Sequence, residues 1–177
     1  LEGIQTRYDD TKSVLKRISS GGKEDFVPLM QEIYSQPIKE ELIRTRIREI
    51  KKKGGIAAVS GTPAAAIRFS EVITEESADV FFLQATVVST EHIGPAGQVT
   101  LDLKKLCNEM GLPVVIGNCV TYEVALELMR AGAAAVMVGI GPGAACTSRG
   151  VLGVGIPQAT AVADCAAARS DYENETG

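Results

Sequence analysis

One cysteine stands where it could act as a nucleophile. Residues 138–150 read Val-Gly-Ile-Gly-Pro-Gly-Ala-Ala-Cys-Thr-Ser-Arg-Gly, a glycine-rich loop that leaves an apolar run and delivers Cys146 beside two hydroxyl residues and Arg149. A loop thiol close to a cation can be held as the thiolate, which is the form that attacks an electrophile. The alternative is a cysteine that packs as a small hydrophobe. The residues by themselves leave both interpretations open.

The same loop is a poor dinucleotide fingerprint. Pro142 interrupts the glycine turn, and the acidic residue expected about 20 positions later is absent, because Asp164 falls in a helical pattern. We therefore exclude a Rossmann-type site. Gly139, Gly141 and Gly143 instead allow sharp backbone turns that aim amide and carbonyl groups at a ligand or a cation.

The other candidate residues favour structural roles. The four cysteines have no CxxC spacing and share the chain with one histidine, which argues against a zinc site. Cys107 and Cys165 fall in helical patterns and are expected in the core, with Cys119 slightly more open. His92, a lone loop histidine, is expected to be solvated. Reduced cysteines in apolar segments indicate a cytoplasmic protein.

The elements that carry these residues alternate between apolar runs and helical patterns. Four short apolar runs predict buried strands, over residues 56–60, 79–83, 113–117 and 134–139. Helices are predicted near residues 63–76, 100–110, 121–131 and 157–169. Strands this apolar indicate a parallel sheet covered by helices, either doubly wound or a (β/α)8 barrel, and periodicity does not decide between them. In both folds ligands collect at the carboxyl ends of the strands.

Residues 9–53 form a charged, helical region ahead of the sheet. An apolar stripe predicts an amphipathic helix over residues 37–50, and its members are Ile38, Leu42, Ile43, Ile47 and Ile50. The lysines at 51–53 precede two glycines, which is typical of a helix C-terminus. We therefore do not interpret them as a basic binding patch.

Composition limits the classes of partner. The chain has 177 residues, 45% hydrophobic and 23% charged, which is enough for one domain with a core. A net charge of −4 gives no reason to expect nucleic acid or an anionic membrane as a partner. No apolar run approaches the roughly 20 residues that span a bilayer. The first residues have neither an initiator Met nor signal-peptide order, so we expect them to be internal to a longer protein.

Three motifs, in order, resemble those of the IMP dehydrogenase and GMP reductase family. The family's glycine-rich turn followed by Cys-Thr-Thr-Arg is similar to residues 139–149, which end in Cys-Thr-Ser-Arg. Its Pro-Gln-Ala-Thr-Ala-Val helix start is similar to residues 157–162, and its Gly-Asn-Val-x-Thr strand end to residues 117–121. The N-terminal part resembles the IMP dehydrogenase-related branch that lacks the regulatory CBS insertion. The resemblance covers essentially the whole chain.

The resemblance implies a (β/α)8 TIM barrel, an α/β fold of which this chain would hold the middle part, about strands 3 to 6. Residues 1–53 would be a helical segment leading into the barrel, and residues 54–177 its central βα units. A whole barrel takes about 250 residues, so the catalytic domain would be incomplete. The outer strands, near residues 56 and 134, are expected to have open edges.

The resemblance also implies a reaction, in which a cysteine thiolate adds to C2 of a purine nucleotide and hydride passes between C2 and a nicotinamide. Cys146 matches that nucleophile, and Ser148 the hydroxyl residue two positions on. The expected enzyme is an IMP dehydrogenase, which converts IMP, NAD+ and water to XMP and NADH in GMP biosynthesis. One alternative is a GMP reductase, which converts GMP and NADPH to IMP and ammonia and whose Gly-Val-Gly-x-Pro-Gln resembles residues 153–158. The other is a non-catalytic nucleotide-binding paralogue.

Further site residues implied by the resemblance lie in the loop and at the end of the preceding strand. The nucleotide would contact Gly143, Ala144, Ala145 and Cys146. The NAD or NADP cofactor would contact Asn118, Gly139, Ile140 and Gly141. A K+ ion would be held by the backbone carbonyls of Gly141, Gly143 and Cys146. The family's assembly would be a homotetramer or octamer.

Three positions depart from the family pattern. Ser148 replaces the usual Thr, which keeps the hydroxyl and loses a stiffening methyl. Ala144 stands where the dehydrogenases commonly place a phosphate-binding Ser, and Gln84 where an Asp usually holds the cofactor ribose. These departures bear on nucleotide affinity and on the choice of cofactor.

Overall fold

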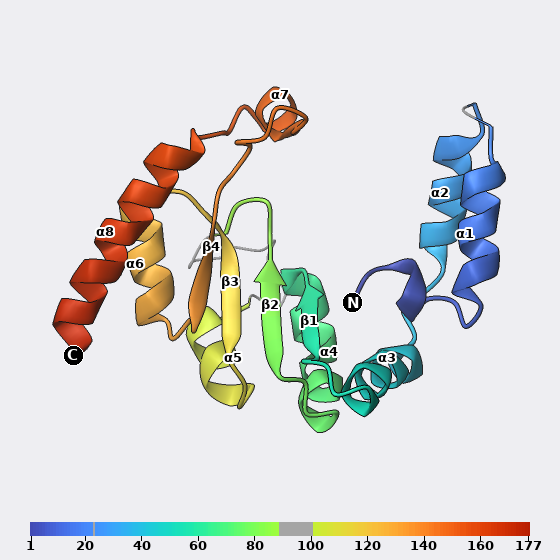
Figure 1. Ribbon diagram of the computed structural model, residues 1–177, viewed down its shortest axis with the longest axis horizontal. Helices are drawn as coiled ribbons and strands as arrows, with labels where there is room; N and C mark the ends of the chain where they lie inside the picture. The colour runs from blue at the N-terminus through green and yellow to red at the C-terminus, as the bar shows by residue number, and fades with distance from the viewer. Residues whose placement is uncertain (23, 89–100) are drawn as a thin grey trace, which may run out of the picture.

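The computed structural model describes residues 1–22, 24–88 and 101–177 (Figure 1). Within these ranges four strands alternate with helices, close to the predicted positions. The strands are β1 Ala58–Gly61, β2 Val80–Gln84, β3 Val114–Cys119 and β4 Ala135–Val138. The helices that follow them are α4 Pro63–Glu75, α5 Leu103–Glu109, α6 Tyr122–Arg130, α7 Ser148–Leu152 and α8 Gln158–Thr176. His92 and the first residue of the helix predicted over residues 100–110 lie outside the described residues.

The strand order identifies a barrel rather than a doubly wound sheet. All neighbouring strands are parallel, and their order in the sheet is β1-β2-β3-β4, the same as along the chain. A doubly wound sheet reverses its order at a switch point, whereas a barrel adds each strand beside the last. Right-handed crossovers between successive strands place the connecting helices on the same face. The alternative that periodicity left open is thereby decided.

Helices α4, α5 and α6 each begin with a side-chain cap. Thr62, Asp102 and Thr121 precede α4, α5 and α6, and each side chain accepts a hydrogen bond from the backbone N–H three residues on. Gly111 and Gly132 have positive φ values of 64° and 100° after α5 and α6, so the chain turns there toward the next strand. These short connections set the strand register.

The core lies between the sheet and its helices. Alternate strand residues point into it, and Phe81, Leu83 and Ile116 have no exposed surface. Phe69 of α4 and Leu128 of α6 pack against the same cluster. The residues between them, such as Phe82, are only half-buried, because the described helices cover one face of the sheet. The uncovered face is the one that a barrel turns inward, so cover on one face agrees with the barrel.

Strands β1 and β4 are the two outer strands, as predicted, and they do not pair with each other in the described sheet. The first residues of the chain lie beside the end of β1. The Leu1 amino group donates to Ser60 O, and Glu2 Oε2 accepts from Thr62 N at 3.0 Å. The open half-barrel expected from the sequence is thus present.

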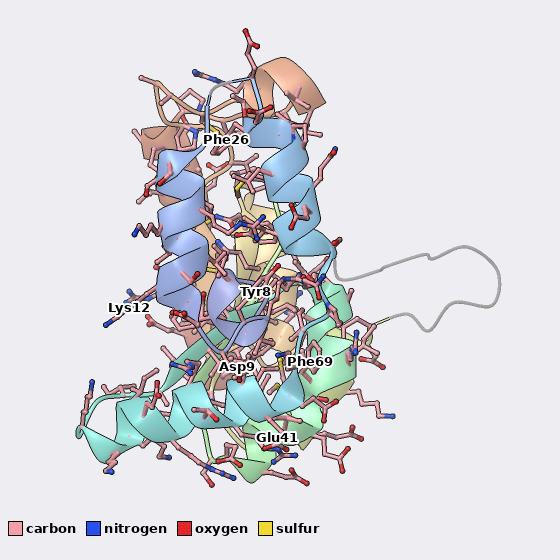
Figure 2. The ribbon with its side chains drawn as sticks, turned by 90° about the vertical axis from the view of Figure 1, so that its right-hand side faces the viewer. Tyr8, Asp9, Lys12, Phe26, Glu41 and Phe69 are labelled. Carbon is pink, nitrogen blue, oxygen red and sulfur yellow. The ribbon has the colours of Figure 1, made fainter. Side chains whose placement is uncertain are left out.

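Three helices precede the sheet. The short 3-10 helix η1 Ile4–Thr6 comes first in the chain and contacts both α1 and α3. Helices α1 Thr11–Ser20 and α2 Phe26–Ser35 pack against each other as a hairpin, and α3 Glu40–Lys52 lies across its base (Figure 2). Helix α3 carries most of the predicted stripe, since Leu42, Ile43 and Ile47 are buried, whereas Ile50 at its end is 38% exposed. None of the helices in the described ranges is long and apolar enough to cross a membrane.

Candidate active site

The glycine loop leaves the carboxyl end of β4, where the fold predicts ligands to bind. Gly139 has φ 130° and Gly141 has φ 64°, backbone conformations that side chains other than glycine rarely adopt. The loop then runs to Cys146 and enters the short helix α7, and a second turn leads into α8 (Figure 1). Two of the three glycines are therefore required by backbone geometry, as the sequence indicated.

Neighbouring strand ends hold the start of the loop. Gly139 N donates to Cys119 O at 2.9 Å, and Ile156 N donates to Ile140 O at 3.1 Å. The Asn118 side chain lies at the end of β3 and donates from Nδ2 to Gly139 O at 3.0 Å. The structure thus brings Asn118 to Gly139, two of the four residues expected to contact the cofactor, and the other two, Ile140 and Gly141, follow Gly139 directly in the chain.

Cys146 is half-buried and closely associated with Ser148. Its backbone N–H donates to Gly143 O at 3.1 Å, which closes a turn, and its Sγ lies 3.4 Å from Ser148 Oγ. Hydrogen bonds from the Ser148 hydroxyl and backbone lower the pKa of the Cys146 thiol, and the charge of Arg149 lowers it by a smaller amount. The sequence pointed to Arg149 as the cause, but the neighbouring hydroxyl matters more.

The Arg149 side chain mainly packs against the loop and holds its two turns together. Its aliphatic stem fills the space beside two glycines, since a Cβ added to Gly141 would lie 2.9 Å from Arg149 Cγ and one added to Gly155 only 2.3 Å from it. Its Nη2 reaches Gly143 O at 3.4 Å. The two turns of the loop are thereby packed against one side chain.

The residues next to Cys146 leave room for a substrate. Gly143, Ala144 and Ala145 are all exposed, and a Cβ added to Gly143 would meet nothing closer than Cys146 Cβ at 3.8 Å. Gln84 is exposed at the end of β2, and the next residue, Ala85, exchanges backbone hydrogen bonds with Gly117 and Asn118. All of the predicted site residues therefore lie along one end of the sheet.

The remaining cysteines are structural. Cys165 is buried as predicted, and Cys107 is half-buried. Cys119 was expected to be more open, but it is 2% exposed at the end of β3, against Cys165 of α8. Burial raises the pKa of Cys119 to about 12. The apolar cover supplied by α8 explains the difference, since strand periodicity says nothing about a helix that begins 39 residues later, at Gln158.

Two side-chain hydrogen bonds near the ends of β1 and β4 had no chemical signal in the sequence. The Gln158 side chain donates from Nε2 to Val138 O at 3.1 Å, although its Pro-Gln motif marked only a helix start. The Glu2 carboxylate accepts from Thr62 Oγ1 at 2.9 Å at the end of β1. Both depend on segments that are distant in sequence.

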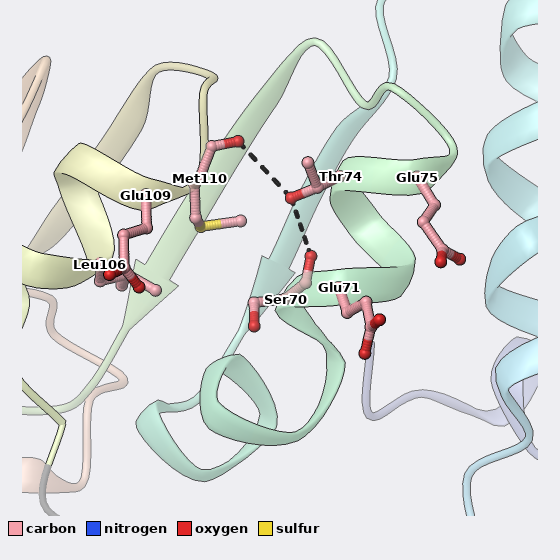
Figure 3. Close-up of a pocket in the computed structure, with 7 residues that line it drawn as sticks. All are labelled: Ser70, Glu71, Thr74, Glu75, Leu106, Glu109 and Met110. Carbon is pink, nitrogen blue, oxygen red and sulfur yellow. Dashed lines mark hydrogen bonds between the residues drawn. The ribbon is translucent and has the colours of Figure 1, made fainter.

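A cavity of about 360 Å³ between α4 and α5 is not part of this site (Figure 3). It is lined by Ser70, Glu71, Thr74, Glu75, Leu106, Glu109 and Met110. Thr74 and Met110 lie where their helices lead into the next strand, at the opposite end of the sheet from the loop. Among the described side chains, no group of three or more His, Cys, Asp or Glu residues could hold a metal ion.

The fold and the loop together define a βα-barrel protein with a half-buried cysteine, Cys146, in a loop that leaves the carboxyl end of a strand. Residues 12–176 match the family model described as the IMP dehydrogenase / GMP reductase domain. The chain belongs to this family of oxidoreductases.

Known relatives agree with this assignment. An uncharacterized oxidoreductase of Mycobacterium tuberculosis is 35% identical over 182 residues, which cover 99% of this chain and 48% of that protein. An inosine-5'-monophosphate dehydrogenase of Haemophilus influenzae is 62% identical over 60 residues, 34% of this chain and 12% of that protein. A crystal structure of an IMP dehydrogenase/GMP reductase-like protein from Corynebacterium glutamicum matches with a TM-score of 0.84 and 32% identity, over 99% of this chain and 46% of that one. The chain thus spans about half the length of the proteins that it matches end to end.

Proposed function

We propose that this chain is part of an IMP dehydrogenase whose nucleophile is Cys146. The observation that carries the proposal is the pairing of Cys146 Sγ with Ser148 Oγ at 3.4 Å, in a glycine loop at the carboxyl ends of the strands. The lowered pKa of the Cys146 thiol increases the fraction of thiolate at neutral pH, and the thiolate is the attacking form. Exposed Gly143, Ala144 and Ala145 allow a purine nucleotide to approach the sulfur.

In this proposal the Cys146 thiolate forms a bond to C2 of IMP, and the hydride leaves C2. NAD, when bound, accepts that hydride. Ser148 donates a hydrogen bond to the thiolate and so holds it ready for attack. Water then releases XMP and restores the thiol.

The residues at the strand ends fit a dinucleotide. The residues that would contact it lie where β3 and β4 end, the edge at which this fold binds ligands, and they are Asn118, Gly139, Ile140 and Gly141. Gln84 at the neighbouring strand end is neutral, where family members usually have an acidic residue for the cofactor ribose. NAD and NADP are both compatible with this neutral residue, and we assign NAD because the dehydrogenase reaction uses it.

The loop also fits a monovalent cation. Backbone carbonyl oxygens suit a hard cation, and the positive φ of Gly141 turns its peptide at no steric cost. Gly143 O already accepts from Cys146 N at 3.1 Å and from Arg149 Nη2 at 3.4 Å. K+ held by Gly141, Gly143 and Cys146 would therefore take the place of the longer contact to Arg149.

A GMP reductase is the second candidate. Residues 153–158 read Gly-Val-Gly-Ile-Pro-Gln, and Gly155 is one of the two glycines against which the Arg149 stem packs. The reductase would use the same Cys146 attack on C2, with loss of ammonia and hydride delivered from NADPH. A homotetramer or octamer is the assembly that we propose for either enzyme.

The test is turnover by a complete barrel that contains this sequence. IMP with NAD+ should yield NADH and XMP in equal amounts, and GMP with NADPH should yield no IMP. Release of IMP and ammonia from GMP would assign the reductase instead. Binding of IMP without turnover in either direction would identify the non-catalytic paralogue and would refute the proposed function.

A further inference from the structure

The segment that enters α8 contacts the start of the catalytic loop at three successive residues. Gln158 Nε2 donates to Val138 O at 3.1 Å, and Ile156 N donates to Ile140 O at 3.1 Å. Between these two bonds, Gly139 lies against the Gln158 amide, because a Cβ at Gly139 would be only 2.6 Å from Gln158 Oε1. The first residues of the loop after β4 therefore pack against the Gln158 side chain.

Helix α8 is anchored independently of this contact. Tyr122 of α6 donates to Asp171 Oδ2 at 2.7 Å, and Arg130 Nε donates to Glu175 Oε2 at 3.1 Å. Cys165 and Ala168 of α8 belong to the buried core. These contacts hold α8, and with it the backbone of Gln158, without help from the loop. The Gln158 side chain can therefore determine the position of the loop, instead of being positioned by it.

The two peptides on either side of Gly139 have different partners. Val138 O accepts from the Gln158 amide, and Gly139 O accepts from the Asn118 amide at 3.0 Å. Gly139 has φ 130°, and with no Cβ it has a wide range of alternative conformations. Two side-chain amides on successive carbonyls therefore hold the backbone at the point where the loop that carries Cys146 begins.

We propose that Gln158 is a positioning residue of the reaction, whose side-chain N–H group holds Val138 O and so directs the loop that carries Cys146. The inference rests on the proposed function for its catalytic meaning. It does not require Gln158 to touch substrate. What matters is that the side chain donates a hydrogen bond at this point.

Gln158→Glu tests the donor directly. The ionised carboxylate cannot donate to Val138 O, whereas the protonated acid can, with nearly the same shape. In a complete barrel we expect about tenfold lower kcat at neutral pH, the size expected for one lost hydrogen bond, with little change in KM for IMP. The ratio of variant to parent kcat should recover as the pH falls toward the pKa of the introduced carboxyl. Gln158→Met, which never donates, should show the same loss without recovery.

A second measurement is independent of the natural substrates. The rate of Cys146 alkylation by iodoacetamide reports the position and accessibility of the thiolate. The ratio of the alkylation rate in the variant to that in the parent should recover at low pH for Gln158→Glu and should not recover for Gln158→Met. Gln31→Glu on the exposed face of α2 is the matched control and should leave both ratios at one.

The outcomes separate the two proposals. If the parent turns over neither IMP nor GMP, the proposed function fails, and the alkylation ratios still decide the role of Gln158. Parent-like alkylation and turnover in Gln158→Met would overturn the positioning role. In Gln158→Glu, a loss that keeps the same variant-to-parent ratio at every pH would overturn it too, because the protonated carboxyl regains the donor and should restore the ratio.

Discussion

Cys146 Sγ lies 3.4 Å from Ser148 Oγ, two residues along the same turn. The thiol donates to the hydroxyl oxygen in the neutral form, and the hydroxyl can rotate to donate to the thiolate once the proton has left. The pair therefore favours the charged form, and the pKa of Cys146 is lower than that of an ordinary cysteine. Arg149 lies further along the loop and adds a weaker effect of the same sign.

Removing the Ser148 hydroxyl should raise the pKa of Cys146. In Ser148→Ala the thiolate loses its main hydrogen-bond donor, so the midpoint of the pH profile of iodoacetamide alkylation should move upward. Turnover at neutral pH should fall with the thiolate fraction. Ser148→Thr keeps the donor and should keep the midpoint. An unchanged midpoint in Ser148→Ala would show that the hydroxyl does not set the pKa.

Cys146→Ser should abolish turnover of IMP while IMP still binds. An alcohol with no strong base beside it is a far poorer nucleophile at neutral pH than a thiolate. In the parent, a thiol reagent should modify one site per subunit, and IMP should protect that site. Cys119 should resist the reagent, because it is buried and its pKa is raised to about 12. Turnover by Cys146→Ser at the parent rate would refute the mechanism.

Two other cysteines provide controls for the Cys146 substitution. Cys107→Ser and Cys165→Ser should reduce stability with little effect on turnover, because a hydroxyl buried without a partner costs roughly 1–3 kcal/mol. The loss should be larger for Cys165, which is 4% exposed, than for the half-buried Cys107. Urea unfolding and steady-state kinetics on the same samples would separate the two effects.

The strands were predictable from sequence, because buried strands leave apolar runs that a local pattern detects. Their order was not, since periodicity left a doubly wound sheet and a barrel open, and only the family resemblance implied the barrel. The apolar run at residues 79–83 corresponds to strand β2 Val80–Gln84. Half-burial of Phe82 was not predictable from its apolar run, since it depends on which face of the sheet the helices cover. The burial of Cys119 and the bond from Gln158 to Val138 both arise when α8 packs back on the sheet. Such contacts join segments 20 or more residues apart and leave no periodic signal.

The proposed cation should be detectable through activity. In a complete barrel, K+ should support turnover, and replacement by tetramethylammonium at equal ionic strength should reduce it strongly, since that ion is too large for converging carbonyl oxygens. Arg149 competes for Gly143 O at 3.4 Å, so Arg149→Met should lower the K+ concentration that gives half-maximal activity. Equal activity in the two salts would contradict the assignment of Gly141, Gly143 and Cys146 as cation ligands.

Acid should weaken the attachment of α3 to the barrel through Glu76. Its carboxylate is 9% exposed and accepts from Arg48 Nε at 2.6 Å and from Arg44 Nη1 at 3.3 Å. The hydrogen bond from Arg48 is the main cause that lowers the pKa of Glu76. A carboxyl whose pKa is lower in the folded state stabilises the fold above its unfolded pKa, about 4.3, and loses this effect as the pH falls through the folded value.

Glu76→Gln should therefore lower the unfolding temperature at neutral pH, and its difference from the parent should shrink in acid. Glu109→Gln is the control, since Glu109 lies 4.0 Å from Lys105 with both side chains 66% exposed. It should change the unfolding temperature little at any pH. A constant difference between Glu76→Gln and the parent across the acid range would show that ionisation of Glu76 is not what stabilises this contact.

The open edge of β4 should make the 177-residue chain associate when it is expressed by itself. Ala134 N donates to Val114 O at 2.8 Å, and successive N–H groups of a strand point to opposite sides, so the Ala135 N–H faces away from β3. Unpaired edge groups of this kind pair with another chain. Ala135→Pro removes the outward donor while leaving the bonds to β3, and it should lower association in sedimentation velocity at rising concentration. Val136→Pro removes an inward N–H instead and should cost about 1–3 kcal/mol of unfolding free energy. A parent chain that stays monomeric at every concentration would refute the prediction.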